Sequence, residues 1–273
     1  MELAVKVAEQ AAVLIMDVYR EKKLDVQFKS DNTPVTQADL LAHHLIVNQL
    51  QQVTDSNHNR IPVLSEESVN FDWQERKSWQ TYWLIDPLDG TKEFVAKNDE
   101  FTVNIALIHL GQPVVGVVLA PALDAIYMAA RGVGAFKKTQ HQPLLQIKVR
   151  SVPEINGEQQ YTILTGRRTV SPSIVKLFKH LPNHHKVYLG SSLKSCYIAE
   201  GLADLYPRYG KTSEWDTAAA QCILECAGGS ITDLQLTPLK YNSKDSLINP
   251  PFIAWGDATI QWALLLEQIK NDA

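Results

Sequence analysis

Apolar residues recur at helical spacing along the first part of the chain. The pattern runs from Glu2 to about Tyr19, and after a polar turn a second amphipathic helix is predicted to begin near Thr36. A short apolar run, Tyr82–Ile85, then predicts a strand. We expect this strand to end at Asp86-Pro87, because proline has no N–H to donate to a sheet.

Three more apolar runs follow, separated by turns that contain glycine or proline. They predict consecutive antiparallel strands at Val103–Leu110, Val114–Leu119 and Ala125–Ala130. The polar stretch Lys137–Gln142 is followed by Pro143 and predicts a boundary. We therefore expect two lobes, an N-terminal α+β lobe at residues 1–140 and a C-terminal α/β lobe at residues 141–273.

Short apolar runs alternate with helical patterns beyond this boundary, which predicts a second α/β layer. The predicted strands lie near Tyr161–Leu164 and Val187–Leu189. The predicted helices lie near Pro172–His180, Leu193–Ala203, Glu214–Ala227 and Ala258–Ile269. A fold of class α/β or α+β follows from this order of elements.

Composition places the chain among globular proteins. It has 273 residues, of which 45% are hydrophobic and 21% charged, and its formal net charge is −4. This charge argues against a nucleic-acid polymer as partner. The longest apolar run in the first helix is Ala11–Met16, far below the ~20 residues of a transmembrane helix. We expect a cytoplasmic protein, and peripheral association with the cytoplasmic face of the inner membrane stays open.

The cysteines show no zinc-binding pattern. Cys222 and Cys226 lie four apart on a predicted helix, a spacing that a metal or redox pair could use, and Cys196 lies apart from both. The favoured interpretation is that these are reduced thiols packed as small apolar groups. We assign them no function.

Acidic residues gather where the predicted strands and helices begin or end. Asp86 and Asp89 flank Pro87-Leu88 and precede Gly90, so a stiff and then sharply turning backbone aims two carboxylates. Glu66-Glu67 ends another apolar run, and Asp216 lies in the first turn of a helix. If these acids converge, they repel one another unless a cation lies among them.

All of these donors are oxygens, which suits Mg²⁺, with Mn²⁺ as a substitute, rather than zinc. Two such ions can promote attack of water on a phosphate, so the cluster predicts a hydrolase. Each motif alone has an ordinary explanation as a turn, a surface pair or a helix start. The combined pattern is what favours a metal site.

Several longer strings resemble the inositol monophosphatase superfamily of lithium-sensitive, magnesium-dependent phosphatases, and the resemblance spans nearly the whole chain. They are Leu64-Ser65-Glu66-Glu67-Ser68, Trp83-Leu84-Ile85-Asp86-Pro87-Leu88-Asp89-Gly90-Thr91-Lys92-Glu93-Phe94 and Glu214-Trp215-Asp216-Thr217-Ala218-Ala219. Further strings resemble its 3′(2′),5′-bisphosphate nucleotidase branch, the CysQ type. These are the Lys92-Glu93-Phe94 ending, Pro34-Val35-Thr36-Gln37-Ala38-Asp39 and Gly190-Ser191-Ser192-Leu193-Lys194.

The resemblance implies a layered αβαβα sandwich with the site between two lobes and two or three Mg²⁺ ions. The implied metal ligands are Glu66, Asp86, the backbone carbonyl of Leu88, Asp89 and Asp216. Thr91 would hydrogen-bond to Asp39, and together with Glu66 they would polarise the attacking water. The alternative for Asp39 is a helix-capping role after Thr36.

The implied reaction is hydrolysis of the 3′-phosphate of adenosine 3′,5′-bisphosphate to AMP and phosphate, with 3′-phosphoadenylyl sulfate as a second substrate. Its implied substrate contacts are Glu66, Leu88, Asp89, Gly90, Thr91, Ser191, Lys194, Arg208 and Asp216. Lys194 and Arg208 would recognise the second phosphate, although either could be a solvated basic residue. A monomer is favoured over a dimer.

The chain departs from the nucleotidase pattern at one place. Relatives often carry Ser-Arg-Ser-His after a strand, where this chain has Thr165-Gly166-Arg167-Arg168, so the pocket for the base could differ. The alternatives that remain are an inositol monophosphatase or related sugar-phosphate phosphatase and, less favoured, a non-catalytic sensor of phosphate metabolites.

Overall fold

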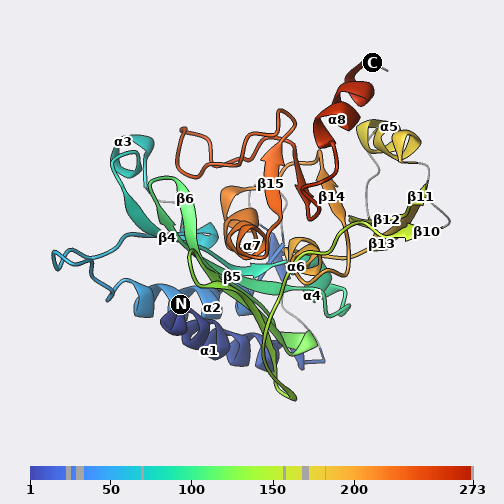
Figure 1. Ribbon diagram of the computed structural model, residues 1–273. Helices are drawn as coiled ribbons and strands as arrows, with labels where there is room; N and C mark the ends of the chain where they lie inside the picture. Colours follow the sequence, from blue (N-terminus) through green and yellow to red (C-terminus); the bar gives the residue numbers. More distant parts are fainter. Residues whose placement is uncertain are drawn as a thin grey trace.

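Helices and sheets alternate in layers through the molecule, in the order helix, sheet, helix, sheet, helix (Figure 1). The structure is a computed structural model, and it describes residues 1–22, 26–28, 34–68, 71–155, 158–167, 172–181 and 183–271. The layers follow from elements that each bury an apolar face.

The first two layers are a pair of helices and the large sheet. Helices α1 (Glu2–Tyr19) and α2 (Gln37–Leu50) pack against each other and against one face of this sheet. The large sheet has seven strands in the order β3 (Val63–Ser65), β4 (Thr81–Asp89), β5 (Thr102–His109), β6 (Gln112–Ala120), β7 (Ala125–Ala130), β8 (Gly134–Thr139) and β9 (Gln142–Gln146). From β4 to β9 consecutive strands pair antiparallel, which confirms the predicted series of antiparallel strands.

The end of β4 differs from the prediction. The strand does not stop at Asp86-Pro87 but continues to Asp89, and its pairing with β5 shifts register between Asp86 and Asp89. Such a bulge leaves the proline without a ladder partner, so its missing N–H costs nothing. The bulge therefore changes the direction of the chain where the two aspartates lie.

The predicted boundary at residue 140 falls inside the hairpin that joins β8 and β9. Because β9 pairs with β8, the large sheet extends to Gln146. A polar stretch such as Lys137–Gln142 is equally typical of an exposed hairpin and of a linker, so its polarity alone suggested a boundary between lobes. The division of function between two lobes stays a prediction.

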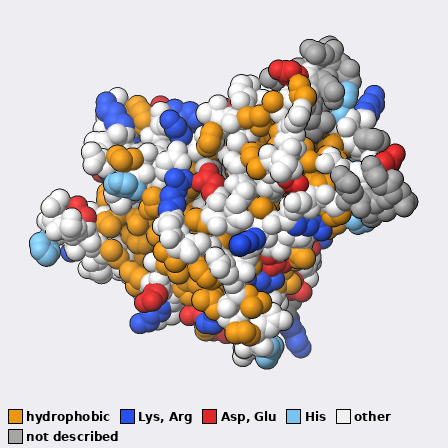
Figure 2. All heavy atoms as spheres, viewed as in Figure 1, with side chains coloured by type: hydrophobic (Ala, Val, Ile, Leu, Met, Phe, Trp, Pro, Cys, Tyr) orange, Lys and Arg blue, Asp and Glu red, His pale blue; other side chains and the backbone are white. Residues whose placement is uncertain are grey.

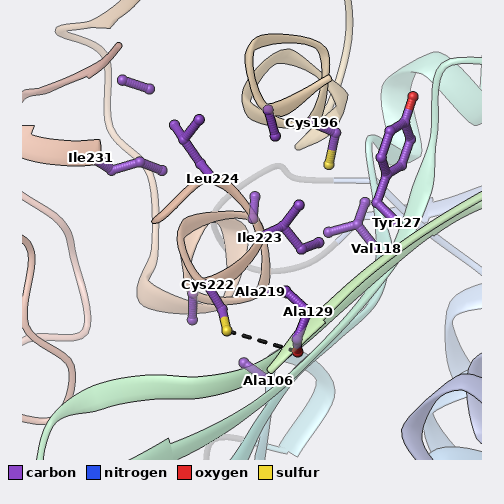
Figure 3. Close-up of a cluster of buried hydrophobic side chains, with 14 of the residues drawn as sticks. Ala106, Val118, Tyr127, Ala129, Cys196, Ala219, Cys222, Ile223, Leu224 and Ile231 are labelled. Carbon is purple, nitrogen blue, oxygen red and sulfur yellow. Dashed lines mark hydrogen bonds between the residues drawn. The ribbon is translucent and has the colours of Figure 1, made fainter. Parts of the chain in front are cut away.

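The middle layer consists of α6 (Leu193–Ala199) and α7 (Glu214–Cys226), which lie against the other face of the large sheet. Figure 3 shows this contact, with Cys222 and Ala219 of α7 directed at Ala106 and Ala129 of the sheet. The approach is closest at Gly116 of β6, where an added Cβ would lie 2.3 Å from the carbonyl oxygen of Ala219. Only glycine fits at this contact.

The thiols take part in this packing. Cys196 and Cys222 are buried and Cys226 is partly exposed, and all three are free. The Cys222 thiol lies 3.9 Å from the carbonyl oxygen of Ala129 (Figure 3). For Cys196 and Cys222 the structure confirms the interpretation as buried thiols.

The small sheet and two helices complete the layers. Its five strands lie in the order β13 (His184–Tyr188), β12 (Tyr161–Thr165), β14 (Leu205–Arg208), β16 (Phe252–Trp255) and β15 (Ser230–Asp233). β12 is parallel to β13 and β14, and β16 is antiparallel to its neighbours, so the sheet is mixed. Helices α5 (Pro172–His180) and α8 (Trp262–Asn271) pack beside it and share an apolar cluster with it.

Two predicted helices have different bounds in the structure. α6 ends at Ala199 rather than Ala203, because the chain turns at Gly201 with φ of +77°. α8 begins at Trp262 rather than Ala258, since Asp257 accepts hydrogen bonds from the backbone and hydroxyl of Thr259 and holds a turn there.

The remaining elements are short. They are the antiparallel pair β1 (Val26–Phe28) and β2 (Pro34–Thr36), the pair β10 (Glu154–Ile155) and β11 (Glu158–Gln159), the helices α3 (Trp73–Arg76) and α4 (Thr91–Val95), and the 3₁₀ turns Glu66–Ser68 and Pro121–Leu123. Within the described residues, no helix has the length and apolar character to cross a membrane. Lys and Arg side chains are scattered among hydrophobic and acidic ones on the face shown in Figure 2.

Candidate active site

Three carboxylates from distant parts of the chain meet at one point. Glu66 follows β3, Asp86 lies on β4 and Asp216 lies in the first turn of α7. Each offers an oxygen atom, and these three atoms lie within 4.8 Å of one another. The large sheet and the buried helix α7 thus bring together Glu66 and Asp216, which are 150 residues apart along the chain.

The mutual repulsion of these carboxylates favours the binding of a cation among them. Asp86 is only 1% exposed, and its burial together with the neighbouring Glu66 and Asp89 carboxylates raises its pKa well above the usual range. Burial and the charge of Asp89 raise the pKa of Asp216 in the same direction. Among the described residues, no recorded ion pair involves Asp86 or Asp216. Oxygen donors at this spacing fit a divalent ion such as Mg²⁺.

The backbone holds each acid in place. Asp86 accepts a hydrogen bond from the Leu88 N–H at 3.1 Å, within the bulge of β4. Asp216 accepts one from the Ser213 N–H at 2.9 Å, as part of a capping box at the start of α7. The orientation of both side chains is therefore fixed by local structure before any ion binds.

Asp89 is oriented by a loop from the other end of the chain. Its Oδ2 accepts hydrogen bonds from the Ser191 hydroxyl at 2.6 Å and from the Ser192 N–H at 2.7 Å. Ser191 has a φ of +54°, which is unusual for a residue other than glycine. The loop 190–192 thus adopts a strained conformation next to a predicted metal ligand.

Asp39 makes both of the contacts that the sequence left as alternatives. Its Oδ2 accepts from the Thr36 N–H at 2.7 Å and completes a capping box for α2. Its Oδ1 accepts from the Thr91 hydroxyl at 3.2 Å, and the same hydroxyl lies 3.4 Å from the carbonyl oxygen of Leu88. Burial raises the pKa of Asp39. The capping role and the contact with Thr91 are therefore both present.

A cavity of about 460 Å³ opens beside these acids. Asp89, Gly90 and Asp216 contribute to its wall. The predicted substrate contacts Ser191, Lys194 and Arg208 line the same cavity. The expected residues from both halves of the chain are thus brought together around one space, whereas Glu66, Leu88 and Thr91 lie outside its lining.

The two predicted phosphate-binding cations differ in their surroundings. Lys194 is 5% exposed and donates to the carbonyl oxygens of Leu189 at 3.1 Å and Ser191 at 2.6 Å. Burial lowers its pKa to about 8. Arg208 donates to the carbonyl oxygen of Lys211 at 3.2 Å, but its buried Nε has no partner among the described residues. Because a guanidinium has five N–H groups, the single hydrogen bond to Lys211 leaves Arg208 more donors for an anion than Lys194 retains after donating to two carbonyls.

Some residues at the site were not predicted from the sequence. Ser192 acts through its backbone N–H, which no sequence pattern reveals. Glu100 and Arg167 form an ion pair, and Arg167 lines the cavity. The departure from the family pattern at Thr165-Gly166-Arg167-Arg168 was a signal for Arg167, whereas Arg168 lies outside the described residues. Nothing in the sequence singled out Glu100.

Comparison with known proteins identifies the family to which the chain belongs. A family described as the inositol monophosphatase family matches residues 1–267. The chain belongs to this family. Inositol monophosphatase family proteins that resemble it include the 3′(2′),5′-bisphosphate nucleotidase CysQ of Escherichia coli strain K12, 42% identical over 248 residues, which are 90% of this chain and 96% of that protein. The protein of the same name from Haemophilus influenzae is 38% identical over 262 residues, with 96% and 94% covered.

Solved structures of the inositol monophosphatase family share the layered fold. The crystal structure of CysQ from Bacteroides thetaiotaomicron has a TM-score of 0.78 and 36% identity, covering 93% of this chain and 96% of that one. An inositol monophosphatase from Thermotoga maritima also has a TM-score of 0.78, at 23% identity, with 99% and 98% covered, and shows the fold alone. The expected layered sandwich is confirmed. The chain is a metal-dependent phosphatase of this family.

Proposed function

We propose that this enzyme hydrolyses the 3′-phosphate of adenosine 3′,5′-bisphosphate to give AMP and phosphate. The observation that carries this proposal is that Asp89 and Asp216 line the same cavity as Arg208, a guanidinium that donates to the carbonyl oxygen of Lys211 and has further N–H groups to donate. One end of the cavity suits the phosphate that reacts, and the cation suits a second phosphate. The names of the relatives from Escherichia coli and Haemophilus influenzae support the same substrate.

Five groups would hold two or three Mg²⁺ ions, with Mn²⁺ as a substitute. They are the carboxylates of Glu66, Asp86, Asp89 and Asp216 and the backbone carbonyl of Leu88. When bound, the ions supply neutralisation of the phosphate and polarisation of the attacking water. The bulge and capping hydrogen bonds described above hold the Asp86 and Asp216 carboxylates in position.

Asp39 and Thr91 would accept the proton that the attacking water loses. The Thr91 hydroxyl donates to Asp39, so its oxygen can accept a hydrogen bond from water while its own proton moves toward the carboxylate. Glu66 would orient the same water. A new P–O bond forms from this water, the bond to the 3′ oxygen breaks, and that oxygen takes up a proton. The raised pKa of Asp39 makes it a better proton acceptor than an exposed aspartate.

The second phosphate would distinguish this substrate from a monophosphate. Arg208 would contact it directly, and a cation left without its phosphate would disfavour other substrates. Lys194 donates to two backbone carbonyls, which leaves one N–H for the substrate. Ser191 and Gly90 line the same cavity and would contact the substrate there. By the same contacts 3′-phosphoadenylyl sulfate would be a second substrate.

The deciding experiment is phosphate release from adenosine 3′,5′-bisphosphate, 3′-AMP and inositol 1-phosphate, each with Mg²⁺ and with chelator. We expect Mg²⁺-dependent release with a strong preference for the bisphosphate. Replacement Arg208→Ala should raise the KM for the bisphosphate and leave that for 3′-AMP nearly unchanged. Lys211→Ala is a matched control, because Lys211 contributes only its backbone carbonyl to Arg208.

The outcomes separate the candidate substrates. A preference for inositol 1-phosphate would replace the nucleotide by a sugar phosphate while keeping the metal chemistry. Binding of phosphate compounds without turnover would indicate a sensor. Equal effects of Arg208→Ala on both nucleotides would contradict the second-phosphate role. Sedimentation of the pure enzyme tests the expected monomer.

A further inference from the structure

Glu100 joins three separate segments near the metal cluster. Its carboxylate accepts two hydrogen bonds from the guanidinium of Arg167, the one from Nη2 at 2.6 Å. Its Oε2 also accepts from the backbone N–H of Gly190 at 2.7 Å. The Glu100 side chain is 13% exposed and that of Arg167 is 43% exposed. The carboxylate thus lies on the inner side of the pair, against the loop 190–192.

The backbones around Glu100 are packed too tightly for other residues. An added Cβ at Gly190 would lie 2.8 Å from the Glu100 carbonyl oxygen and 2.8 Å from Cγ of Glu93. An added Cβ at Gly90 would lie 3.1 Å from the same carbonyl oxygen and 3.4 Å from Cβ of Ser191. The segment around Glu100 therefore lies between the Asp89-Gly90 turn and the loop 190–192.

The loop 190–192 has a conformation that needs support. Ser191 has a positive φ, a strained conformation for a residue other than glycine that persists only where neighbours impose it. The loop is fixed at the Gly190 N–H by Glu100 and at the Ser191 carbonyl by Lys194. From this position it donates two hydrogen bonds to Asp89. The chain of contacts runs from Glu100 through Gly190 to the Asp89 carboxylate.

We propose that Glu100 is a positioning residue for the metal ligand Asp89, acting through the backbone of the loop 190–192. This inference rests on the proposed role of Asp89 as a ligand. Glu100 does not need to touch the ion or the substrate. Arg167 also donates to the Glu100 carboxylate, but the hydrogen bond from the Gly190 N–H to Glu100 is the contact that links Glu100 to the loop.

Binding of Mn²⁺ without substrate tests this role, with free Mn²⁺ measured by electron paramagnetic resonance. We expect Glu100→Ala to weaken binding about tenfold at the site that includes Asp89. Glu100→Gln should restore it to within about threefold of the parent, because its amide oxygen still accepts from the Gly190 N–H. Arg167→Ala should resemble Glu100→Gln, since it leaves that hydrogen bond in place.

The pair Arg131–Glu225 provides a matched control. The two side chains form an ion pair at 2.7 Å, and their exposed fractions of 43% for Arg131 and 21% for Glu225 are close to those of Arg167 and Glu100. Arg131 follows β7 and Glu225 lies on α7, and neither residue lines the cavity. Glu225→Ala should leave Mn²⁺ binding unchanged. If Glu225→Ala weakens binding as much as Glu100→Ala does, the effect is general loss of stability and the inference is wrong.

The remaining outcomes are also decisive. Parental Mn²⁺ binding by Glu100→Ala would refute the positioning role, and so would equal losses in Glu100→Ala and Glu100→Gln. If Glu100→Ala does not fold, Glu100→Gln and Arg167→Ala decide, since losses above about threefold in either contradict the inference. Asp89→Asn separates the two proposals. Unchanged Mn²⁺ binding in Asp89→Asn overturns the ligand assignment itself. Weakened binding in Asp89→Asn together with parental binding in Glu100→Ala overturns only this inference.

Discussion

Asp86→Asn should stabilise the protein when no metal is present. The side chain is 1% exposed and carries one of three oxygens that lie within 4.8 Å of one another. At that separation, two unit charges repel by about 3.5 kcal/mol with an effective dielectric constant of 20. Asparagine removes this repulsion and still accepts the hydrogen bond from the Leu88 N–H. Partial protonation of the parent cluster reduces the gain to about 1–2 kcal/mol.

The assay is thermal unfolding in chelator and in excess Mg²⁺. For a chain of this size, 1–2 kcal/mol corresponds to an increase in Tm of about 2–8 °C in chelator. In Mg²⁺ at 100 times its Kd, the free energy of unfolding of the parent should rise by about 3 kcal/mol. That of Asp86→Asn should rise by much less, because the variant binds the ion more weakly. The order of the two Tm values would therefore reverse between chelator and Mg²⁺.

Asp204 supplies the control. It is equally buried at 1% exposure, but it pairs with Arg150 at 2.8 Å. Asp204→Asn should therefore lower Tm in both conditions, because it leaves a guanidinium without its partner. A fall in Tm for Asp86→Asn in chelator, comparable to that of Asp204→Asn, would refute the view that the empty cluster is repulsive.

Three further predictions concern catalysis, packing and pH. Thr91→Val should lower kcat about 100-fold or more while Thr91→Ser retains most activity, because only the hydroxyl can donate to Asp39; equal kcat values would exclude the relay. Gly116→Ala should lower the urea midpoint by the equivalent of about 1–3 kcal/mol, whereas Gly166→Ala, with no atom within 4 Å of its added Cβ, should not. Burial lowers the pKa of His43 below its unfolded value of 6.5, so the unfolded state binds more protons and stability falls as pH drops below about 6.5. His43→Asn should flatten the fall between pH 7 and 5.5 in urea titrations, and an unchanged slope would contradict this.

The sequence predicted the elements whose apolar pattern is regular. The strands from β4 to β7 and the helices α1, α5 and α7 lie close to their expected positions, whereas β8 and β9 were not predicted. The acids that converge were also identified, because Glu66, Asp86 and Asp216 lie in strings that resemble a known family. Local pattern was sufficient wherever local structure decides the conformation.

Features that depend on distant contacts could not be predicted. The bulge in β4 arises from pairing with β5, and proline alone suggested an end to the strand. The hairpin at residue 140 had the polarity of a linker, although it belongs to the large sheet. The buried position of Lys194 and the contact of Glu100 with the Gly190 N–H depend on segments that are far apart in the chain. Such contacts have no signature in a single sequence.

The position of Asp216 on α7 has a consequence for biosynthesis. α7 lies between the two sheets, and most residues that line the cavity with Asp216 come from the last third of the chain. At about 5–20 residues per second, a ribosome needs roughly 7–26 s to make the 130 residues between Asp86 and Asp216, as 216 minus 86 gives. During that interval the nascent chain carries only part of the acid cluster. With Asp216 as a ligand, as proposed, we expect no action on phosphate esters until the chain has been made through Asp216 and α7 has packed between the sheets.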